Sequence, residues 1–329
     1  MHDLAVIIVS TNDRGWLGPC LGSLYERSGD LELDVVVVDN DSTDGTSELV
    51  REEFPQARVV SCRNRGFGHA NNRALLSCEA RYVLFLNPDT EILEGTLAEL
   101  VSLLDDRPEI GLAGVRQLTA DGSLFPTIFR FPNALRALGE AIGVARFSRA
   151  PAWLGGRVMD QSAYAHEVEV DWLTGSFMLV RAEALLGAGV FDERFFMSSE
   201  ETDLAYRIRQ AGWRVVHMAQ LTILHHVHAG QPLGDRMFAQ YEFSRRQYAE
   251  KHFSPVHRAI YLTLVRLRWQ IRLLLSLVGQ GGASRRTIRR ALRTLSGAEA
   301  PPFGEPPEVA VQPIDDALVP AGRRPSAVP

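Results

Sequence analysis

Residues 82–91, Tyr-Val-Leu-Phe-Leu-Asn-Pro-Asp-Thr-Glu, decide how the rest of this chain is interpreted. The apolar run Tyr82–Leu86 is typical of a strand buried on both faces, as in the middle of a mostly parallel sheet. Asn87-Pro88 ends the strand, because proline has no N–H for the ladder and disfavours helical geometry in the residue before it. Asp89 therefore follows the carboxyl end of a central strand, where open α/β sheets bind their ligands.

Two interpretations of Asp89 are open from this stretch alone. A carboxylate on a rigid strand end suits a divalent cation that also holds a diphosphate. Alternatively, Asp89 and Thr90 form an Asx-type turn and cap a helix near Gly95–Leu104. The choice between them depends on what the rest of the chain places beside Asp89.

The composition indicates one large domain or one domain with appendages. With 329 residues, of which 46% are hydrophobic, the chain can bury a sizeable core. Its net charge of -5 gives no reason to expect nucleic acid as a partner. The scattered Cys20, Cys62 and Cys78 fit neither a disulfide framework nor a zinc site, and predict thiols of a reducing compartment. No basic segment precedes the short apolar run Leu4–Val9, so we expect a cytoplasmic protein.

Strand-like and helix-like segments alternate through the first half. The expected strands are Leu4–Ser10, Val35–Val38, Arg58–Ser61, Tyr82–Leu86 and Ile110–Val115. Helices are expected at Trp16–Glu26 and Thr46–Glu53, and this alternation predicts a parallel, doubly wound sheet. Because crossover connections are right-handed, the loops after the strands gather at one edge. Thr11-Asn12, Asp39 and Asp89 should then lie near one another.

Polar loops after the second and third expected strands suit a nucleotide. The Asp39 carboxylate can accept hydrogen bonds from a base or from ribose hydroxyls. Helix capping explains Ser42–Asp44 but does not require Asp39. In Asn64–Arg73, Gly66 and Gly68 let the backbone approach a base or a diphosphate closely. This loop is not the dinucleotide fingerprint, and as a phosphate loop it is weak evidence by itself.

Ordered motifs along the first 230 residues carry a family resemblance. They are Val-Ser-Thr-Asn at 9–12, Val-Val-Asp-Asn-Asp-Ser-Thr-Asp-Gly at 37–45, Asn-x-Gly-Phe-Gly-x-Ala-Asn-Asn at 64–72, Leu-Asn-Pro-Asp-Thr at 86–90, Val-Asp-Trp-Leu-Thr-Gly-Ser at 170–176, Phe-Asp-Glu-x-Phe-Phe-Met at 191–197, Glu-Glu-Thr-Asp-Leu at 200–204 and Ala-Gly-Trp at 211–213. The chain resembles the inverting family 2 glycosyltransferases of the GT-A fold, especially their rhamnosyltransferase-like branch. The resemblance implies an α/β fold, a nucleotide-diphospho-sugar donor, a hydroxyl-bearing acceptor, and Mg2+ or Mn2+.

The resemblance also implies roles for individual residues. Nucleotide recognition falls on Thr11, Asn12, Asp39, Asn64, Gly66 and Asn71. Asp89 matches the acidic metal-binding position of the family's Asp-x-Asp-type motif, although Asn87 stands where the first aspartate would be. A histidine before a glycine-containing turn can face the metal or the diphosphate. Of His225, His226 and His228, we favour His226.

Inverting transfer needs one general base, which takes a proton from the acceptor hydroxyl as it attacks the anomeric carbon. By resemblance this role falls on Glu201, where the family usually has an aspartate, and Glu200 is the runner-up. A capping box from Ser198 to Glu201 fits the same spacing equally well. Asp203 lies one helical turn before Arg207 and is expected to pair with it or to support the loop.

The acceptor side is expected where the strand-like segments Glu167–Leu173 and Phe177–Arg181 meet at a turn that contains Gly175. We assign Trp172, Gly175 and Asp203 to this side. The Trp172 ring could stack on a sugar, but a tryptophan here is more often part of the core, and we favour the core.

The C-terminal part has a different character. Arg258–Gln280 predicts a long amphipathic helix, the arginine-rich Arg285–Arg293 follows it, and the proline- and alanine-rich Ala298–Pro329 predicts disorder. Arginines in the middle of the helix argue against a membrane span. Two interpretations are open: the helix packs on the catalytic domain, or it lies on an anionic membrane surface with its arginines toward the headgroups, near a lipid-linked acceptor.

The predicted organisation is a GT-A catalytic domain at 1–230, with a nucleotide-binding half at 1–118 and an acceptor and base half at 165–230, then a helical basic segment at 231–297 and a tail at 298–329. The expected reaction moves rhamnose from dTDP-rhamnose to a cell-envelope glycan or its lipid-linked precursor. Two alternatives are a sugar nucleotidyltransferase, whose early glycine-rich phosphate loop is absent after Leu4–Ser10, and a non-catalytic nucleotide-sugar-binding protein. Donor hydrolysis without acceptor would distinguish an enzyme from such a binder.

Overall fold

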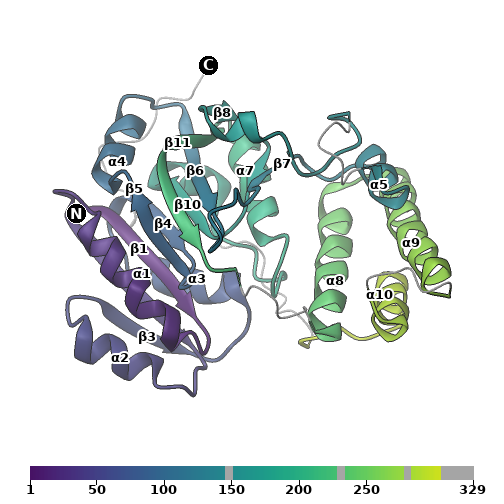
Figure 1. The fold of residues 1–329 in the computed structure, drawn as a ribbon, viewed down its shortest axis with the longest axis horizontal. Helices are drawn as coiled ribbons and strands as arrows, with labels where there is room; N and C mark the ends of the chain where they lie inside the picture. The colour runs from purple at the N-terminus through teal and green to yellow at the C-terminus, as the bar shows by residue number, and fades with distance from the viewer. Residues whose placement is uncertain (145–150, 228–233, 278–282, 305–329) are drawn as a thin grey trace.

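The computed structural model describes residues 1–144, 151–227, 234–277 and 283–304. A mixed sheet forms its centre, with helices on both faces (Figure 1). The strands of this sheet are β1 (His2–Ser10), β2 (Leu33–Asn40), β3 (Arg58–Cys62), β4 (Ala80–Leu86), β5 (Thr90–Glu94), β6 (Ile110–Leu118), β8 (Val168–Glu169), β10 (Phe177–Arg181) and β11 (Arg214–His225). A separate two-stranded sheet pairs β7 (Ile128–Phe129) with β9 (Trp172–Leu173).

The strand order is β3-β2-β1-β4-β10-β6-β11-β5, with β8 paired to β11. Strands β1 to β4 are parallel, as the alternation of elements predicts. Strand β10 enters antiparallel between β4 and β6, with Met178 opposite Phe85. Strand β6 is thereby separated from β4, so the expected nucleotide-binding and acceptor halves are interleaved in one sheet.

The opening stretch forms the predicted buried strand, and Tyr82–Leu86 are at most 2% exposed. After it, Asp89 lies in a short connection to β5, which runs antiparallel to β11. Helix α4 (Leu97–Asp105) is capped instead by a reciprocal capping box between Thr96 and Glu99. The interpretation of Asp89 and Thr90 as the cap of this helix is therefore wrong.

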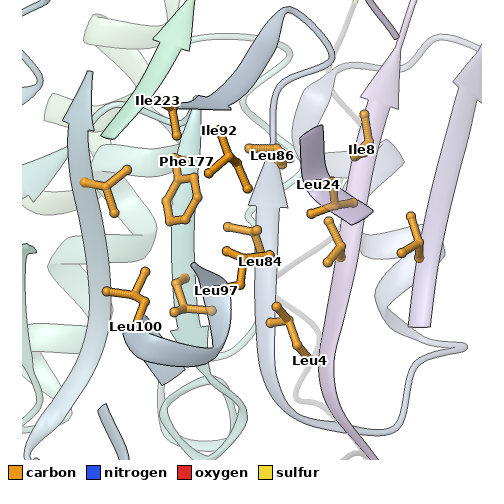
Figure 2. Close-up of a cluster of buried hydrophobic side chains, with 14 of the residues drawn as sticks. Leu4, Ile8, Leu24, Leu84, Leu86, Ile92, Leu97, Leu100, Phe177 and Ile223 are labelled. Atoms are coloured by element: carbon orange, nitrogen blue, oxygen red, sulfur yellow. The ribbon is translucent and has the colours of Figure 1, made fainter. Parts of the chain in front are cut away.

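Helices cover both faces of the sheet because each strand sends alternate side chains to opposite faces. One face packs against α1 (Arg14–Glu26), α2 (Thr46–Glu53) and α4, and the other packs against α3 (Phe67–Leu75), α6 (Ala182–Ala188) and α7 (Glu200–Gln210). Figure 2 shows the first of these layers, where Leu4, Leu84 and Phe177 from three neighbouring strands lie with Leu24 of α1 and Leu97 of α4.

The segment that leads to the histidines forms one long strand, β11. Its pairing with β6 shifts in register between Met218 and Thr222. The strand ends at His225. His226 follows directly, while His228 and Gly230 lie outside the described residues.

Four helices form a unit beside the sheet (Figure 1): α5 (Ala134–Ala141), α8 (Asp235–His252), α9 (Pro255–Leu277) and α10 (Arg285–Ser296). Their shared core includes Tyr261, Trp269 and Ile288, all fully buried or nearly so. Helix α9 therefore packs one apolar side against the other helices of this unit.

The segment after α10 has defined contacts where disorder was expected. The Phe303 ring stacks on Phe196 with centroids 4.2 Å apart, and the Arg236 guanidinium lies 3.9 Å above the Phe303 ring. Glu299 accepts a hydrogen bond of 2.7 Å from Arg290. Disorder is thus contradicted for residues 298–304, and residues 305–329 lie outside the described part of the chain.

Candidate active site

Asp89 and His225 face each other at the carboxyl end of the sheet. The connection after β4 carries Asp89, which is 7% exposed, and Thr90 beside it pairs with His225 at the end of β11. His225 Nε2 lies 3.4 Å from Asp89 Oδ1. This pair is the strongest candidate for the metal end of the site.

His226, the histidine favoured from the sequence, points elsewhere. Its backbone N–H donates to Asp89 O at 2.8 Å, but its ring meets Glu91 Oε1 at 2.5 Å and stacks on Trp16 with centroids 4.5 Å apart. Neighbouring residues at a strand end send their side chains to opposite sides. The geometry therefore favours His225 over His226 as the residue that faces the metal position.

The orientation of His225 is set by Gln117, which the sequence analysis missed. Gln117 Oε1 lies 3.1 Å from His225 Nδ1 and accepts a hydrogen bond of 2.9 Å from Ser176 Oγ. An amide oxygen only accepts, so Nδ1 carries the proton and Nε2 is directed at Asp89. A polar residue near the end of the apolar strand β6 is the signal that could have identified Gln117.

The Asp89–His225 pair fits a divalent cation that is shared with a bound diphosphate. A carboxylate oxygen together with an unprotonated imidazole nitrogen is a suitable partial ligand set, and the hydrogen bond to Gln117 fixes the tautomer that such a ligand needs. Within the described residues, no group of three or more His, Cys, Asp or Glu side chains could hold a metal. Beyond the described residues, the diphosphate and water are suitable sources of further ligands.

The two candidate bases, Glu200 and Glu201, are the first residues of helix α7, and the backbone just before them is strained. Ser198 and Ser199 have φ angles of 66° and 76°, a left-handed conformation that is costly for residues other than glycine. No side chain caps the helix, so the capping box from Ser198 to Glu201 is not formed. Glu200 and Glu201 each have a buried carboxylate oxygen without a hydrogen-bond partner among the described residues. Strain and unsatisfied buried oxygens of this kind concentrate at functional sites.

The two carboxyl groups differ in acidity. Burial raises the pKa of Glu201 to about 6, against the opposing effect of nearby backbone N–H groups. Burial, reinforced by the charge of Glu201, raises the pKa of Glu200 well above its ordinary value. With a pKa below 7, Glu201 is the carboxyl of this pair that can accept a proton at neutral pH, and burial favours the neutral form of Glu200 beside it.

A single turn connects the base to the metal end of the site. A Cβ atom added at Gly175 would lie 3.8 Å from Glu201 Cβ and 3.9 Å from the Phe67 ring, so this glycine lies against the base and the expected nucleotide loop. The next residue, Ser176, accepts the Asn87 N–H at 3.0 Å and donates to Gln117. Gly175 is therefore located where an acceptor-side residue is expected, although it contributes backbone only.

The first group of predicted nucleotide residues meets at the ends of β1 and β2. Thr11 Oγ1 donates to Asn40 O at 3.3 Å, and Asn12 Oδ1 accepts the Thr43 N–H at 2.8 Å. The Asp39 carboxylate accepts the Ser42 N–H at 2.9 Å and the Ser47 hydroxyl. Asp39 therefore holds the loop before α2 and the Ser47 hydroxyl in the first turn of that helix, and these bonds compete with a ligand for the carboxylate.

The second group forms a loop that leans on the segment before α7. Gly66 has φ 105°, and a Cβ atom there would lie 2.3 Å from Phe196 O, so only glycine fits. Asn64 Oδ1 accepts the Gly66 N–H at 3.2 Å, and the Phe67 N–H donates to Phe196 O at 2.9 Å. Asn71 is buried and donates to Phe67 O at 3.0 Å. Asn71 therefore braces this loop from within.

Two predicted acceptor residues have structural contacts instead. Trp172 stacks on Phe129 with centroids 4.2 Å apart and donates its Nε1 proton to Arg130 O at 3.2 Å, in agreement with the preference for a packing role. Asp203 is fully buried and is bound by Arg207 Nε at 2.8 Å. Its predicted pairing with Arg207 is present, and its side chain is not available to an acceptor.

Comparisons with known proteins identify the kind of enzyme. The profile of Glycosyl transferase family 2 matches residues 5–142, which hold both expected nucleotide loops and Asp89. A curated rhamnosyltransferase extends the match to 80% of the chain. Residues 5–142 are a glycosyl transferase family 2 domain.

Among curated relatives of this family 2 chain, N-acetylglucosaminyl-diphospho-decaprenol L-rhamnosyltransferase of Mycobacterium tuberculosis is 29% identical over 282 residues, which cover 80% of this chain and 89% of the relative. Rhamnosyltransferase WbbL of Escherichia coli K12 is 25% identical, with 68% of this chain and 83% of the relative covered. The chain is thus an enzyme of the rhamnosyltransferase-like kind, as the motifs predict.

Two solved structures share its fold. The mannosyltransferase PcManGT from Pyrobaculum calidifontis, in complex with GDP-Man and Mn2+, has a TM-score of 0.51 at 18% identity, over 92% of this chain and 82% of that one. GalNAc-T7 with UDP, GalNAc and Mn2+ has a TM-score of 0.55 at 12% identity, over 84% and 58%. The GT-A fold is therefore confirmed. Of the helices that the structure describes here, none has the length and apolarity to cross a membrane.

Proposed function

We propose that this family 2 enzyme transfers rhamnose from dTDP-rhamnose, with inversion, to a hydroxyl of a lipid-linked precursor of a cell-envelope glycan. The observation that carries the proposal is the turn at Gly175 and Ser176. On one side it lies against Glu201, and on the other it connects through Gln117 to His225 and Asp89. An inverting transferase needs this arrangement, with a base on one side of the reacting sugar and the diphosphate site on the other.

The choice of sugar and acceptor is supported by the curated relatives. The M. tuberculosis protein is named for rhamnosyl transfer to a diphospho-decaprenol-linked sugar, and the match covers most of both chains. The E. coli relative is also named a rhamnosyltransferase. We carry both substrate classes over to this chain as part of the proposal.

In the proposed reaction, Glu201 accepts the proton of the acceptor hydroxyl as that oxygen attacks the anomeric carbon. Burial favours the neutral form of Glu200, which limits negative charge beside the base. Asp89 and His225 would hold a divalent cation, which supplies positive charge against the leaving diphosphate. The Gly66 loop brings backbone N–H groups close to the nucleotide, and the buried Asn71 keeps that loop in place.

The test uses purified full-length protein, Mn2+ and a panel of nucleotide-sugars, with polyprenyl-diphospho-N-acetylglucosamine as acceptor. We expect transfer from dTDP-rhamnose alone, with inverted configuration at the anomeric carbon. Asp89→Asn should abolish transfer and weaken metal-dependent binding of dTDP. An intact donor with the wild-type protein, with and without acceptor, would identify a nucleotide-sugar-binding protein instead, and full activity of Asp89→Asn would refute the metal assignment.

Our proposal also includes an anionic membrane surface as a binding partner of the enzyme. Helix α9 leaves one side uncovered, where Val256, Ile260, Leu267 and Leu274 share one face and are 71%, 50%, 36% and 65% exposed. On α10, Arg285, Arg289 and Arg293 are exposed at four-residue spacing, and the Arg285 guanidinium bonds the α9 carbonyl of Ser276. An apolar strip beside a row of arginines is complementary to an anionic bilayer interface.

Flotation with vesicles tests this surface. We expect the protein to float with vesicles of phosphatidylcholine and phosphatidylglycerol, and to be released by high salt. A triple Ile260→Ser, Leu267→Ser, Leu274→Ser variant should stay in solution, whereas Leu76→Ser, at an exposed leucine just after α3, should float. Equal flotation of the triple variant and the wild type would refute the proposal.

A further inference from the structure

The base-bearing helix α7 is held by charged groups from the C-terminal helical unit. Asp203, two residues after Glu201, has no exposed surface. Its Oδ1 lies 2.6 Å from Lys251 Nζ and 2.6 Å from His252 Nε2, both from the last turn of α8, and its Oδ2 lies 2.8 Å from Arg207 Nε. Two of the three side chains that bind this carboxylate therefore come from α8, and all three lie outside residues 5–142, which match the family profile.

Lys251 also reaches a second buried carboxylate. Its Nζ lies 2.7 Å from Oδ2 of Asp192, which likewise has no exposed surface. Asp192 begins the segment that leads to Ser198 and Ser199, and Asp203 lies just beyond them. One ammonium group thus fixes both ends of the strained stretch from which Glu201 emerges.

His252 is held in place as firmly as Lys251. Its ring packs between Tyr206 of α7 and Tyr248 of α8, with centroid distances of 4.5 and 4.6 Å. The effect on Asp203 is visible in its acidity: burial alone would raise the pKa of this carboxyl, but the hydrogen bond from His252 and the charges of Arg207 and Lys251 hold it well below its ordinary value. The Asp203 carboxylate therefore stays ionised at neutral pH.

We infer that Lys251 and His252 are positioning residues for the general base, so that α8 sets the place of the Glu201 carboxylate through Asp203 and Asp192. The inference rests on the proposed function for the role of Glu201 but not on the identity of the sugar. Left-handed conformations at Ser198 and Ser199 persist only when surrounding contacts enforce them. Without Lys251, the two buried carboxylates lose their shared cation, and the first turn of α7 shifts with them.

The experiment compares Lys251→Met and His252→Leu with His252→Gln, whose side-chain amide can still donate to Asp203. Arg246→Gln is the matched control, because it breaks an exposed ion pair with Glu250 on the same helix. We expect Lys251→Met and His252→Leu to lower kcat by about tenfold to 100-fold, since a displacement of about 1 Å has effects of this size. His252→Gln should keep kcat within about threefold. The Kd for dTDP with Mn2+ should change much less than kcat in all variants, because Asn64 and Asn71 hold the Gly66 loop through bonds that do not involve Lys251 or His252.

A second readout does not depend on transfer. Carbodiimide labelling followed by mass spectrometry reports the exposure of Glu201, and the exposed Glu94 serves as the internal standard. Labelling of Glu201 should rise in Lys251→Met and His252→Leu, and stay at the wild-type level in His252→Gln and Arg246→Gln. If the wild type transfers no sugar, the proposed function fails, while the labelling pattern still decides whether α8 positions the carboxylate. Unchanged kcat together with unchanged labelling, in variants that melt at a lower temperature, would show that the cluster contributes stability only and would overturn the inference.

Discussion

Turnover should depend on pH through the raised pKa of Glu201. A base must be deprotonated to act, so activity is present above its pKa and is lost as the pH falls through it. With a pKa of about 6, Glu201 is ionised in about 90% of molecules at pH 7 and in about 10% at pH 5. We therefore expect kcat to fall about ninefold between these two values. A carboxyl group with its ordinary pKa would lose only about a quarter of its ionised fraction over the same interval.

The assay is transfer under saturating donor and acceptor from pH 5 to pH 8, so that kcat reports the bound complex. Glu201→Gln keeps the size of the side chain but cannot take a proton, and its kcat should fall by about 100-fold or more with no acid limb. Glu200→Gln is the matched control, because it makes the same change at the neighbouring carboxyl, whose neutral form burial already favours, and kcat should stay within about threefold. A wild-type kcat that is flat down to pH 5, or a large loss in Glu200→Gln alone, would refute the assignment of the base.

Three further outcomes are expected. Gly66→Ala should weaken dTDP binding, measured by calorimetry, because the added Cβ atom would meet Phe196 O. The control is Gly122→Ala, which has a similar positive φ without a clash and should leave dTDP binding normal. Burial lowers the pKa of His217 to about 4, so the folded state loses stability as the pH falls below 6.5. Urea titrations should show that the free energy of unfolding falls by about 2 kcal/mol between pH 7 and pH 5. This loss should be absent in His217→Phe. Phe303→Ala should lower the free energy of unfolding by about 1 kcal/mol through loss of the stacked pair, and no change would mean that the segment is detached in solution.

The strands that lie at the centre of the sheet could be predicted because their signal is local. Tyr82–Leu86 is apolar at every position, and only a strand with both faces covered accommodates such a run. The placement of β10 could not be predicted. Phe177–Val180 is equally apolar, and an apolar run is the same for a parallel and an antiparallel neighbour, so the sequence contains no indication that β10 enters between β4 and β6.

The sequence predicts the site residues that lie in a recognisable motif, but it does not predict contacts between segments that are distant in the chain. Asp89 follows from its strand end. The choice between His225 and His226 depends on the phase of β11, which the register shift near Met218 alters, and periodicity alone does not reveal such a shift. The contacts of Asp203 with Lys251 and His252 join positions nearly 50 residues apart, and a pairing of that kind leaves no pattern in either segment.

The place of β10 also sets the order in which this chain can fold as it is made. Strand β6 is complete once residue 118 has been added, but within the sheet its partners are β10 and β11, which are translated later. At the usual speed of a ribosome, roughly 3 to 12 s pass before residue 181 follows. During that interval the apolar β6 is a strand without neighbours on a growing polypeptide, the situation in which chaperones act and in which nascent chains associate wrongly. A chain that stalls or ends before residue 181 would therefore contain the paired strands β1 to β4 and an unpaired β6, and it would lack helix α7.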